Sequence, residues 1–392
     1  MYDFTTLRRR RDMGAEKWAE LDERHISDER VIPFSVADMD LLAAPEIIQA
    51  LREATDFGVY GYTVAHSAYR QAVAAWMASR HSWEIRPEWI VNTFGVVHAI
   101  LQAIHAFTQP GDGVIIQTPA YPPFRSAPQA TGRVMLENPL KALGDGRYEL
   151  DFDHLEHLCA RPEAKLLLLC SPHNPTGRVW TREELSKVAE ICSRHGVLVF
   201  SDEIHFDFVF SPHRHTVFAD VDSHCIVATS ASKTFNLAGL STAGIIIPDP
   251  QLRECFEQAG AAHAGSFNSY FGLAAAQAAY EKGGPWLDAL LEHLKGNYRL
   301  AREFLAQRFP SVAVSPQEGT YLLWADFRPL GLTQEHLEAF MRRDALLFTD
   351  EGYILGPGGE GFERLVLACP RKHLEQALER LDQAAARRGL PR

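Results

Sequence analysis

The sequence predicts an α/β protein whose mainly parallel central sheet is covered by helices on both faces, with a smaller α+β region after it. Two observations lead to this class. In the middle of the chain, short apolar runs alternate with helical patterns, as in strands joined by crossover helices. After Gly283-Gly284-Pro285, the pattern changes to a long helix followed by separate strands. The length of 392 residues agrees with two domains, or with one large domain and an appendage.

Five runs in the middle of the chain are expected to be strands of the central sheet. Each run is short, apolar throughout and bounded by Gly, Pro or Asp, which is typical of strands that are buried on both faces. They are residues 114–117 (VIIQ), 166–170 (LLLLC), 197–201 (VLVFS), 226–230 (IVATS) and 244–247 (GIII).

Residues 181–195 carry the clearest helix signal between these strands. Thr181 and Glu184 have the spacing of a capping box, and Leu185, Val188 and Cys192 fall on one helical face. Gly196 follows as a natural end of the helix. A strand, a helix and a strand in this order predict a right-handed crossover between parallel strands.

The end of the chain is expected to form the smaller domain. A helical pattern covers residues 286–309, strand-like runs follow at 321–325 and 365–368, and an amphipathic helix covers residues 372–388. We therefore expect three parts. They are an N-terminal segment (1–45) that packs with the small domain, a large domain (46–284) and a small C-terminal domain (285–392).

Composition limits the possible partners and the location. Hydrophobic residues make up 46% of the chain and charged residues 23%, which is the balance of a soluble globular protein. The net charge of −11 argues against nucleic acid or an anionic membrane as a partner, although Arg8–Arg11 form a basic run. That run is interpreted as a solvated face or a subunit-contact arm, and an interaction tail is the alternative.

The six cysteines have no metal-like spacing, and several lie in apolar stretches, as reduced core cysteines do. The N-terminus lacks an apolar signal core, and no stretch has the length of a membrane span. We therefore expect a cytoplasmic protein.

Three small motifs follow predicted strands, at the edge of the sheet where ligands bind in open α/β folds. Asn174 lies between two prolines in SPHNPTG, which restrict the backbone and hold its side-chain amide in a fixed direction. An ordinary turn explains these residues equally well. Asp202 in SDEIH is expected to be partly desolvated and to need a cation, either a pyridinium nitrogen or a metal ion. His205, His213 and His215 keep a metal site open, but their spacing is not that of a typical ligand set.

Lys233 lies in the third motif, SASKTF, after the run IVATS. An exposed loop lysine is the common alternative. Here the preceding strand places the amine at the mouth of a buried sheet, where desolvation and a nearby cation lower its pKa and make it nucleophilic. The serines around it can bind a phosphate.

Together these motifs resemble those of the fold-type I enzymes that depend on pyridoxal 5'-phosphate, the aspartate aminotransferase superfamily. More narrowly, the chain is similar to the carbon–sulfur lyase branch, the MalY and PatB type of cystathionine β-lyase. The similarity covers nearly the whole chain and includes the following stretches: YDFTTLRRRRDMGAEKW, VIPFSVADMD, GVYGY, TPAYPPF, SPHNPTG, SDEIH, SASKTFNLAGL, GGPWLDAL and FERLVLACPR.

The resemblance implies a role for each of these residues. Lys233 would hold the cofactor as a Schiff base and later move the substrate's Cα proton. Asp202 would pair with the pyridinium nitrogen. Asn174 would donate a hydrogen bond to the cofactor's phenolic oxygen and also lie at the substrate. His205 stands where many aminotransferases have a tyrosine, and Tyr121 would stack on the ring and help in catalysis, with a core tyrosine as the alternative.

The phosphate is expected at the start of a helix. Gly95, Val96 and Val97 precede the apolar helical pattern of residues 98–107, and backbone N–H groups at such a start attract a phosphate. The resemblance adds two groups of ligands. They are Ser230 and Ser232, and Tyr62 from the partner subunit of a homodimer with shared active sites. The glycine-rich run 356–361 does not follow a strand and is interpreted as a loop.

Arg364 is expected to grip the α-carboxylate of an amino-acid substrate, with a surface salt bridge as the alternative. Aminotransferases of this superfamily carry a phosphate-binding arginine eight residues after the lysine, whereas this chain has Ser241 there. The lyase branch also lacks that arginine. We therefore expect a β-lyase that eliminates thiol from S-substituted cysteines, giving pyruvate and ammonia. The alternatives are an aminotransferase, a regulatory binding protein on the same scaffold and a metal-binding module.

Overall fold

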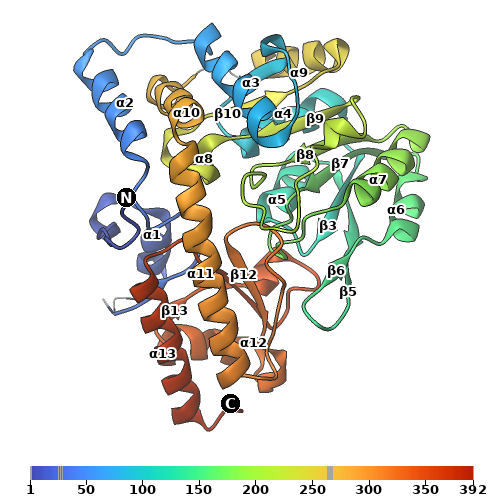
Figure 1. Ribbon diagram of the computed structural model, residues 1–392. Helices are drawn as coiled ribbons and strands as arrows, with labels where there is room; N and C mark the ends of the chain where they lie inside the picture. The colour runs from blue at the N-terminus through green and yellow to red at the C-terminus, as the bar shows by residue number, and fades with distance from the viewer. Residues whose placement is uncertain (1, 25, 27, 29, 263–267, 392) are drawn as a thin grey trace.

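The computed structural model describes residues 2–24, 26, 28, 30–262 and 268–391. Its centre is a seven-stranded sheet, in which one strand runs opposite to the other six (Figure 1). The mainly parallel sheet predicted from the sequence is therefore confirmed. In spatial order the strands are β2 (Ile90–Thr93), β10 (Ala243–Ile246, the antiparallel one), β9 (Cys225–Thr229), β8 (Leu198–Asp202), β7 (Ala164–Cys170), β3 (Gly113–Thr118) and β4 (Val134–Pro139).

Helices cover both faces of this sheet, as the apolar runs predicted. Within β3, Val114 and Ile116 belong to the core on one face and Ile115 to the core on the other. A strand whose successive side chains are all buried must be covered on both sides, since the side chains alternate between faces. One face packs against α4 (Val96–Phe107), α5 (Pro122–Ala130) and α9 (Pro250–Ala262). The core of the other face includes side chains of α2 (Pro45–Asp56), α3 (Ser67–His81), α6 (Phe152–Cys159), α7 (Arg182–His195) and α10 (Tyr270–Lys282).

Helix α7 begins with the capping box that the sequence predicted. The Thr181 hydroxyl accepts a hydrogen bond from the Glu184 N–H (3.2 Å), and the Glu184 carboxylate accepts one from the Thr181 N–H (2.8 Å). Gly196 ends the helix with φ = 68°, a conformation that favours glycine. The helix and the two parallel strands that flank it, β7 and β8, form the expected crossover unit.

A four-stranded antiparallel sheet forms the centre of the C-terminal region. Its strands are, in order, β11 (Ala313–Val314), β12 (Leu322–Asp326), β15 (Phe362–Val366) and β14 (Asp350–Glu351). Strand β15 begins three residues earlier than predicted, so Arg364 lies inside the strand. The helices of this region are α11 (Gly284–Arg308), α12 (Gln334–Ala339) and α13 (Arg371–Arg388).

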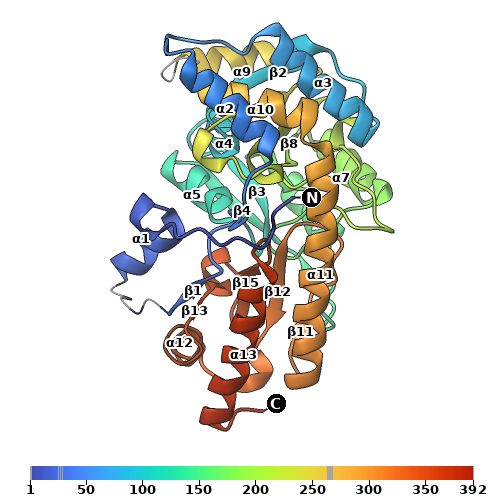
Figure 2. The same cartoon turned by 60° about the vertical axis from the view of Figure 1, so that its left-hand side comes forward.

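Helix α11 runs alongside both regions (Figures 1 and 2). Its first half, through Leu294, contributes to the core that lies on the large sheet, and its second half, from Tyr298, to the core of the C-terminal region. The domain limits proposed from the sequence stay a prediction.

The N-terminal segment packs against the end of the chain. Strand β1 (Ile32–Pro33) pairs in parallel with β13 (Leu347–Phe348), and Ile32 and Phe34 lie in the C-terminal core. Helix α1 (Glu16–Glu23) carries Lys17, whose ammonium is fully buried between Asp38 (2.8 Å) and Asp40 (3.0 Å). These ion pairs fix the loop around residue 38.

The remaining elements are short. Strands β5 (Lys141–Ala142) and β6 (Tyr148–Glu149) form a hairpin. Short helical turns occur at Arg11–Met13, Pro87–Trp89, Phe218–Asp220, Ala231–Thr234 (α8), Ala238–Leu240, Arg328–Leu330, Phe340–Asp344 and Gly352–Leu355. Among the described residues, none of the helices combines the length and the apolar character needed to cross a membrane.

Candidate active site

The predicted site residues follow the carboxyl ends of neighbouring parallel strands. Tyr121 comes after β3, Asn174 after β7, and Asp202 is the last residue of β8. Lys233 lies in α8, directly after β9. Because β3, β7, β8 and β9 are adjacent and parallel, their carboxyl ends share one edge of the sheet, where the sequence predicted a site.

Lys233 is held over this edge by its helix and by the N-terminal segment. The Ser230 hydroxyl begins α8 by accepting a hydrogen bond from the Ser232 N–H (3.0 Å), and it donates one to the Thr242 carbonyl (2.7 Å). The Lys233 ammonium donates to the carbonyl of Ala37 (2.6 Å). Burial, followed by the Arg364 guanidinium, lowers the pKa of Lys233 to about 8. About a tenth of the amine is therefore uncharged at pH 7, and this form is nucleophilic.

Asp202 is buried and lacks a full counter-charge. Its Oδ1 accepts a hydrogen bond from the Ile204 N–H (3.1 Å), but burial raises the pKa of the carboxyl to about 7. Lys233 lies close enough to oppose part of this rise. A cation placed against Asp202 would favour the ionised carboxylate. This fits a protonated pyridine nitrogen.

Two aromatic side chains lie within electrostatic range of these groups, Tyr121 near Asp202 and His205 near Lys233. Burial, followed by the Asp202 carboxylate, raises the pKa of the Tyr121 hydroxyl. Burial, followed by the cations Lys233 and Arg364, lowers the pKa of His205 to about 3, so its imidazole is neutral. The His205 Nδ1 is buried without a hydrogen-bond partner among the described residues, which leaves it for a polar atom of a ligand.

Arg364 is held from two sides. Asp350 Oδ2 accepts from both Nε (3.0 Å) and Nη2 (2.5 Å) of Arg364, and Asn174 Oδ1 accepts from Nη1 (3.0 Å). All three side chains are buried. The Asn174 amide therefore uses its oxygen on Arg364 and keeps its nitrogen as a donor. Arg364 is thus oriented rigidly, as a residue that grips a carboxylate must be.

A helix is present at the position predicted for the phosphate, and it begins at Val96, two residues earlier than expected. Gly95 precedes α4 with φ = 138°, and the N–H groups of Val96, Val97 and the next residue precede the first intrahelical hydrogen bond. The 12-residue helix adds the positive end of its dipole. The proton of the Ser230 hydroxyl is already donated to Thr242, and Ser232 is partly exposed. Their role as phosphate ligands stays a prediction.

Tyr62 lies apart from this cluster on the segment between α2 and α3 (Figure 1), and its side chain is 98% exposed. Its predicted role in the site of a partner subunit stays a prediction. The three histidines considered for a metal do not converge: His215 bonds to Glu203 (2.7 Å). In the described part of the chain, no three His, Cys, Asp or Glu side chains group as metal ligands would.

Sequence reasoning missed Asp350 and the Ala37 carbonyl. Asp350 lies in the two-residue strand β14, opposite Arg364 in the register with β15, but no motif marks it. Ala37 lies within VIPFSVADMD, a stretch already matched to the family, yet its contribution comes from a backbone oxygen that residue identity does not encode.

Comparisons with known proteins agree with this geometry. Residues 29–381 match the aminotransferase class I and II family. The chain is 41% identical to cystathionine beta-lyase PatB of Bacillus subtilis, over 90% of this chain and 92% of that protein. It is 35% identical to protein MalY of Escherichia coli, over 98% and 99% of the two chains. Among solved structures, cystalysin from Treponema denticola, which contains a pyridoxal 5'-phosphate cofactor, matches 99% of both chains with a TM-score of 0.96 and 41% identity.

Proposed function

Because the chain belongs to the aminotransferase class I and II family, we propose that it is a carbon–sulfur β-lyase that depends on pyridoxal 5'-phosphate. The reaction is the elimination of the sulfur substituent from S-substituted L-cysteines, giving a thiol, pyruvate and ammonia. The observation that carries the proposal is the cluster of Lys233, Asp202 and Arg364. The Lys233 amine, whose pKa is lowered, is within electrostatic reach of a buried acid that needs a cation, Asp202, and of a rigidly held guanidinium, Arg364.

The residues fit the cofactor at both of its ends. The start of α4 offers N–H groups to the phosphate, and Asp202 offers an anion to the ring nitrogen. Lys233 supplies the amine for the covalent link, and Tyr121 supplies an aromatic face. When bound, pyridoxal phosphate supplies an electron-accepting ring that stabilises negative charge at the substrate's Cα.

Arg364 binds the substrate's α-carboxylate in a bidentate pair. Asp350 leaves only part of the guanidinium free, which fixes the direction from which the carboxylate approaches. The nitrogen of the Asn174 amide remains a donor beside it. These contacts orient the Cα–H bond toward the base. Holding the reacting groups in this geometry speeds the proton transfer.

Lys233 then acts as the general base that takes the Cα proton. A pKa of about 8 keeps part of the amine unprotonated at neutral pH and still basic enough to accept the proton. The Cβ–S bond breaks with its electron pair on sulfur, and the thiolate takes a proton from Lys233 or Tyr121. The released aminoacrylate hydrolyses to pyruvate and ammonia.

We further propose that the enzyme is a homodimer with shared sites. The segment between α2 and α3 exposes Phe57 (68%), Val59 (64%), Tyr60 (56%), Tyr62 (98%) and Val64 (69%). So many adjacent exposed apolar side chains are typical of an interface. A second copy would cover them and receive Tyr62 in its site. We also propose a cytoplasmic location, because all six cysteines are free and five of them are buried.

The main alternative, an aminotransferase, uses the same residues but must pass the amino group to a keto acid. Ser241 favours the lyase, since aminotransferases of this superfamily have an arginine at that position. Purified protein should release thiol and pyruvate from cystathionine, cystine or another S-substituted cysteine without any keto acid. If amino acids are converted only when a keto acid is added, and no thiol appears, the protein is an aminotransferase and the proposal is wrong.

A further inference from the structure

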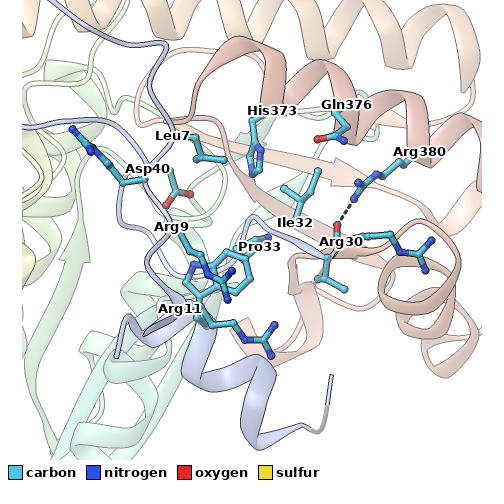
Figure 3. Close-up of a pocket in the computed structure, with 13 residues that line it drawn as sticks. Leu7, Arg9, Arg11, Arg30, Ile32, Pro33, Asp40, His373, Gln376 and Arg380 are labelled. Atoms are coloured by element: carbon cyan, nitrogen blue, oxygen red, sulfur yellow. Dashed lines mark hydrogen bonds between the residues drawn. The ribbon is translucent and has the colours of Figure 1, made fainter. Parts of the chain in front are cut away.

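A basic cavity of about 400 Å³ lies away from the active site, between the N-terminal segment and α13. Figure 3 shows Arg9 and Arg11 on one wall and His373, Gln376 and Arg380 along the helix on the other. Arg8 and Arg30 also line it. Thus three arginines of the run at residues 8–11, for which the proposed reaction has no role, contribute to one concave surface. The volume falls in the range of about 300–1,000 Å³ that is usual for small-molecule sites.

Positive charge in this cavity exceeds negative charge by a wide margin. Five guanidinium groups line it, and Asp40 is the one carboxylate among the lining residues that the structure describes. Asp40 is already shared between Arg10 (3.0 Å) and the buried Lys17 (3.0 Å), so it does not neutralise the cavity. In a protein with a net charge of −11, such a concentration of cations needs a specific reason.

Two of the arginines are not neutralised by an ion pair with a described residue. Arg8 makes no hydrogen bond or ion pair with any described residue, and Arg380 donates only to the backbone oxygen of Arg30. Burial and the neighbouring Arg30 cation lower the pKa of Arg380. An anion bound beside Arg30 and Arg380 would therefore stabilise the charged forms of both guanidinium groups. Arg11 and Arg30 pair with Asp22 and Asp28, aspartates that do not line the cavity. Such partly exposed pairs are weak and exchange readily for a better anion.

The floor of the cavity is apolar. Ile32 and Pro33 form it (Figure 3), and Leu7, Trp18 and Val31 also line the cavity. An inorganic ion would use the guanidinium groups and leave this floor unused. The combination of cationic walls and an apolar floor suits a ligand that carries negative charge and also has an apolar part.

We propose that this cavity binds a small organic anion with at least two negative charges on phosphate or carboxylate oxygens and an apolar part that lies on Ile32 and Pro33. Guanidinium groups bind both kinds of oxyanion in bidentate geometry. The anion would bridge the arginines of the N-terminal segment and Arg380 on α13.

The test is a calorimetric titration at constant ionic strength, with pyridoxal phosphate already bound so that its own phosphate site is filled. The probes are phenyl phosphate, phthalate and benzoate. We expect phenyl phosphate or phthalate to bind once per chain, and the tighter of the two identifies the oxyanion. Benzoate, with one charge, should bind at least about tenfold more weakly, since it forms fewer charge-assisted hydrogen bonds. Dissociation constants above about 1 mM for both dianions, or equal binding of benzoate, would refute the proposal.

Three variants locate the binding. Arg380→Gln should weaken the tighter dianion by about tenfold, the loss expected for one charge-assisted contact. Arg8→Gln should weaken it by a smaller factor, and because Arg8 has no partner among the described residues, its loss leaves the fold intact. Arg387→Gln is the matched control, because it removes the same charge from α13 outside the cavity and should leave binding unchanged. An equal loss in all three variants would mean that only net charge matters, and the site would be rejected.

Discussion

Replacing Asp202 by asparagine should have opposite effects on stability and on catalysis. Without cofactor, Asp202 is an acid buried beside one weak counter-charge, and its pKa is about 7. Asparagine keeps the shape, and its side-chain oxygen still accepts the hydrogen bond from Ile204 N–H. It does not ionise. The variant therefore avoids the free-energy cost of burying a carboxylate at neutral and alkaline pH.

The pKa values give the size and the sign of this effect. The carboxyl has a pKa of 3.8 when unfolded and about 7 when folded, a difference of roughly 3 units or about 4 kcal/mol. Because the folded pKa is the higher one, the associated stability is complete below the unfolded pKa and is lost as pH rises through 7. Between pH 5.5 and pH 8, wild type should therefore lose about 2 kcal/mol that the variant keeps.

The assay is urea unfolding of both proteins, prepared without pyridoxal phosphate and followed by tryptophan fluorescence at pH 5.5 and pH 8. The stability difference in favour of Asp202→Asn should grow with pH. The control Asp145→Asn removes an exposed carboxyl whose pKa is lowered by Arg147, so no gain with pH is expected there. With cofactor bound, the Asp202 variant should remove the Cα proton several orders of magnitude more slowly. A stability difference that is the same at both pH values would refute the reasoning, because Asp202 would then be ionised in the folded protein.

Three further predictions concern individual residues. Borohydride reduction of the purified protein should fix pyridoxal phosphate to Lys233, as seen by peptide mass spectrometry, and label on another lysine would contradict the assignment. Mixing inactive Lys233→Ala with inactive Tyr62→Ala subunits should restore some activity, because one site of each mixed dimer has both native residues; full activity of Tyr62→Ala alone would exclude the shared site. Asp350→Asn should lower kcat/KM by roughly 10–100-fold, mainly through KM, because Arg364 loses a charged anchor worth about 1.5–3 kcal/mol. The control Asp326→Asn, whose partner is the exposed Arg328, should not change kcat/KM. An equal loss of kcat/KM in this control would show that Asp350 has no specific role in the site.

The sequence predicted the central strands well because burial on both faces leaves a strong signal. The runs at β3 and β7 were found within two residues of their observed ends, and those at β8 to β10 were displaced by one residue. Strands β2 and β4 were missed. They lie at the two edges of the sheet, and β4, VMLENP, has an exposed first residue and mixed polarity, so its pattern does not differ from that of a loop.

The candidate site was predictable where chemistry depends on side chains that follow strands, as for Asp202 and Lys233. It was not predictable where a group acts across the fold. Asp350 meets Arg364 only because β14 and β15 pair, and the Ala37 carbonyl reaches Lys233 only because Lys17 fixes the adjacent loop. Neither contact leaves a local pattern in the sequence.

The pairing of β1 with β13 has a consequence for how this chain is made. Strand β1 leaves the ribosome about 315 residues before its partner β13, since Ile32 pairs with Leu347. At about 5–20 residues per second, Ile32 and Phe34 wait roughly 15–60 s before the core that covers them exists. Lys233 likewise meets the Ala37 carbonyl only after the N-terminal segment has docked. Completion of the site therefore follows synthesis of the C-terminal core, and until then the apolar segment around Ile32 and Phe34 is open to binding by a chaperone.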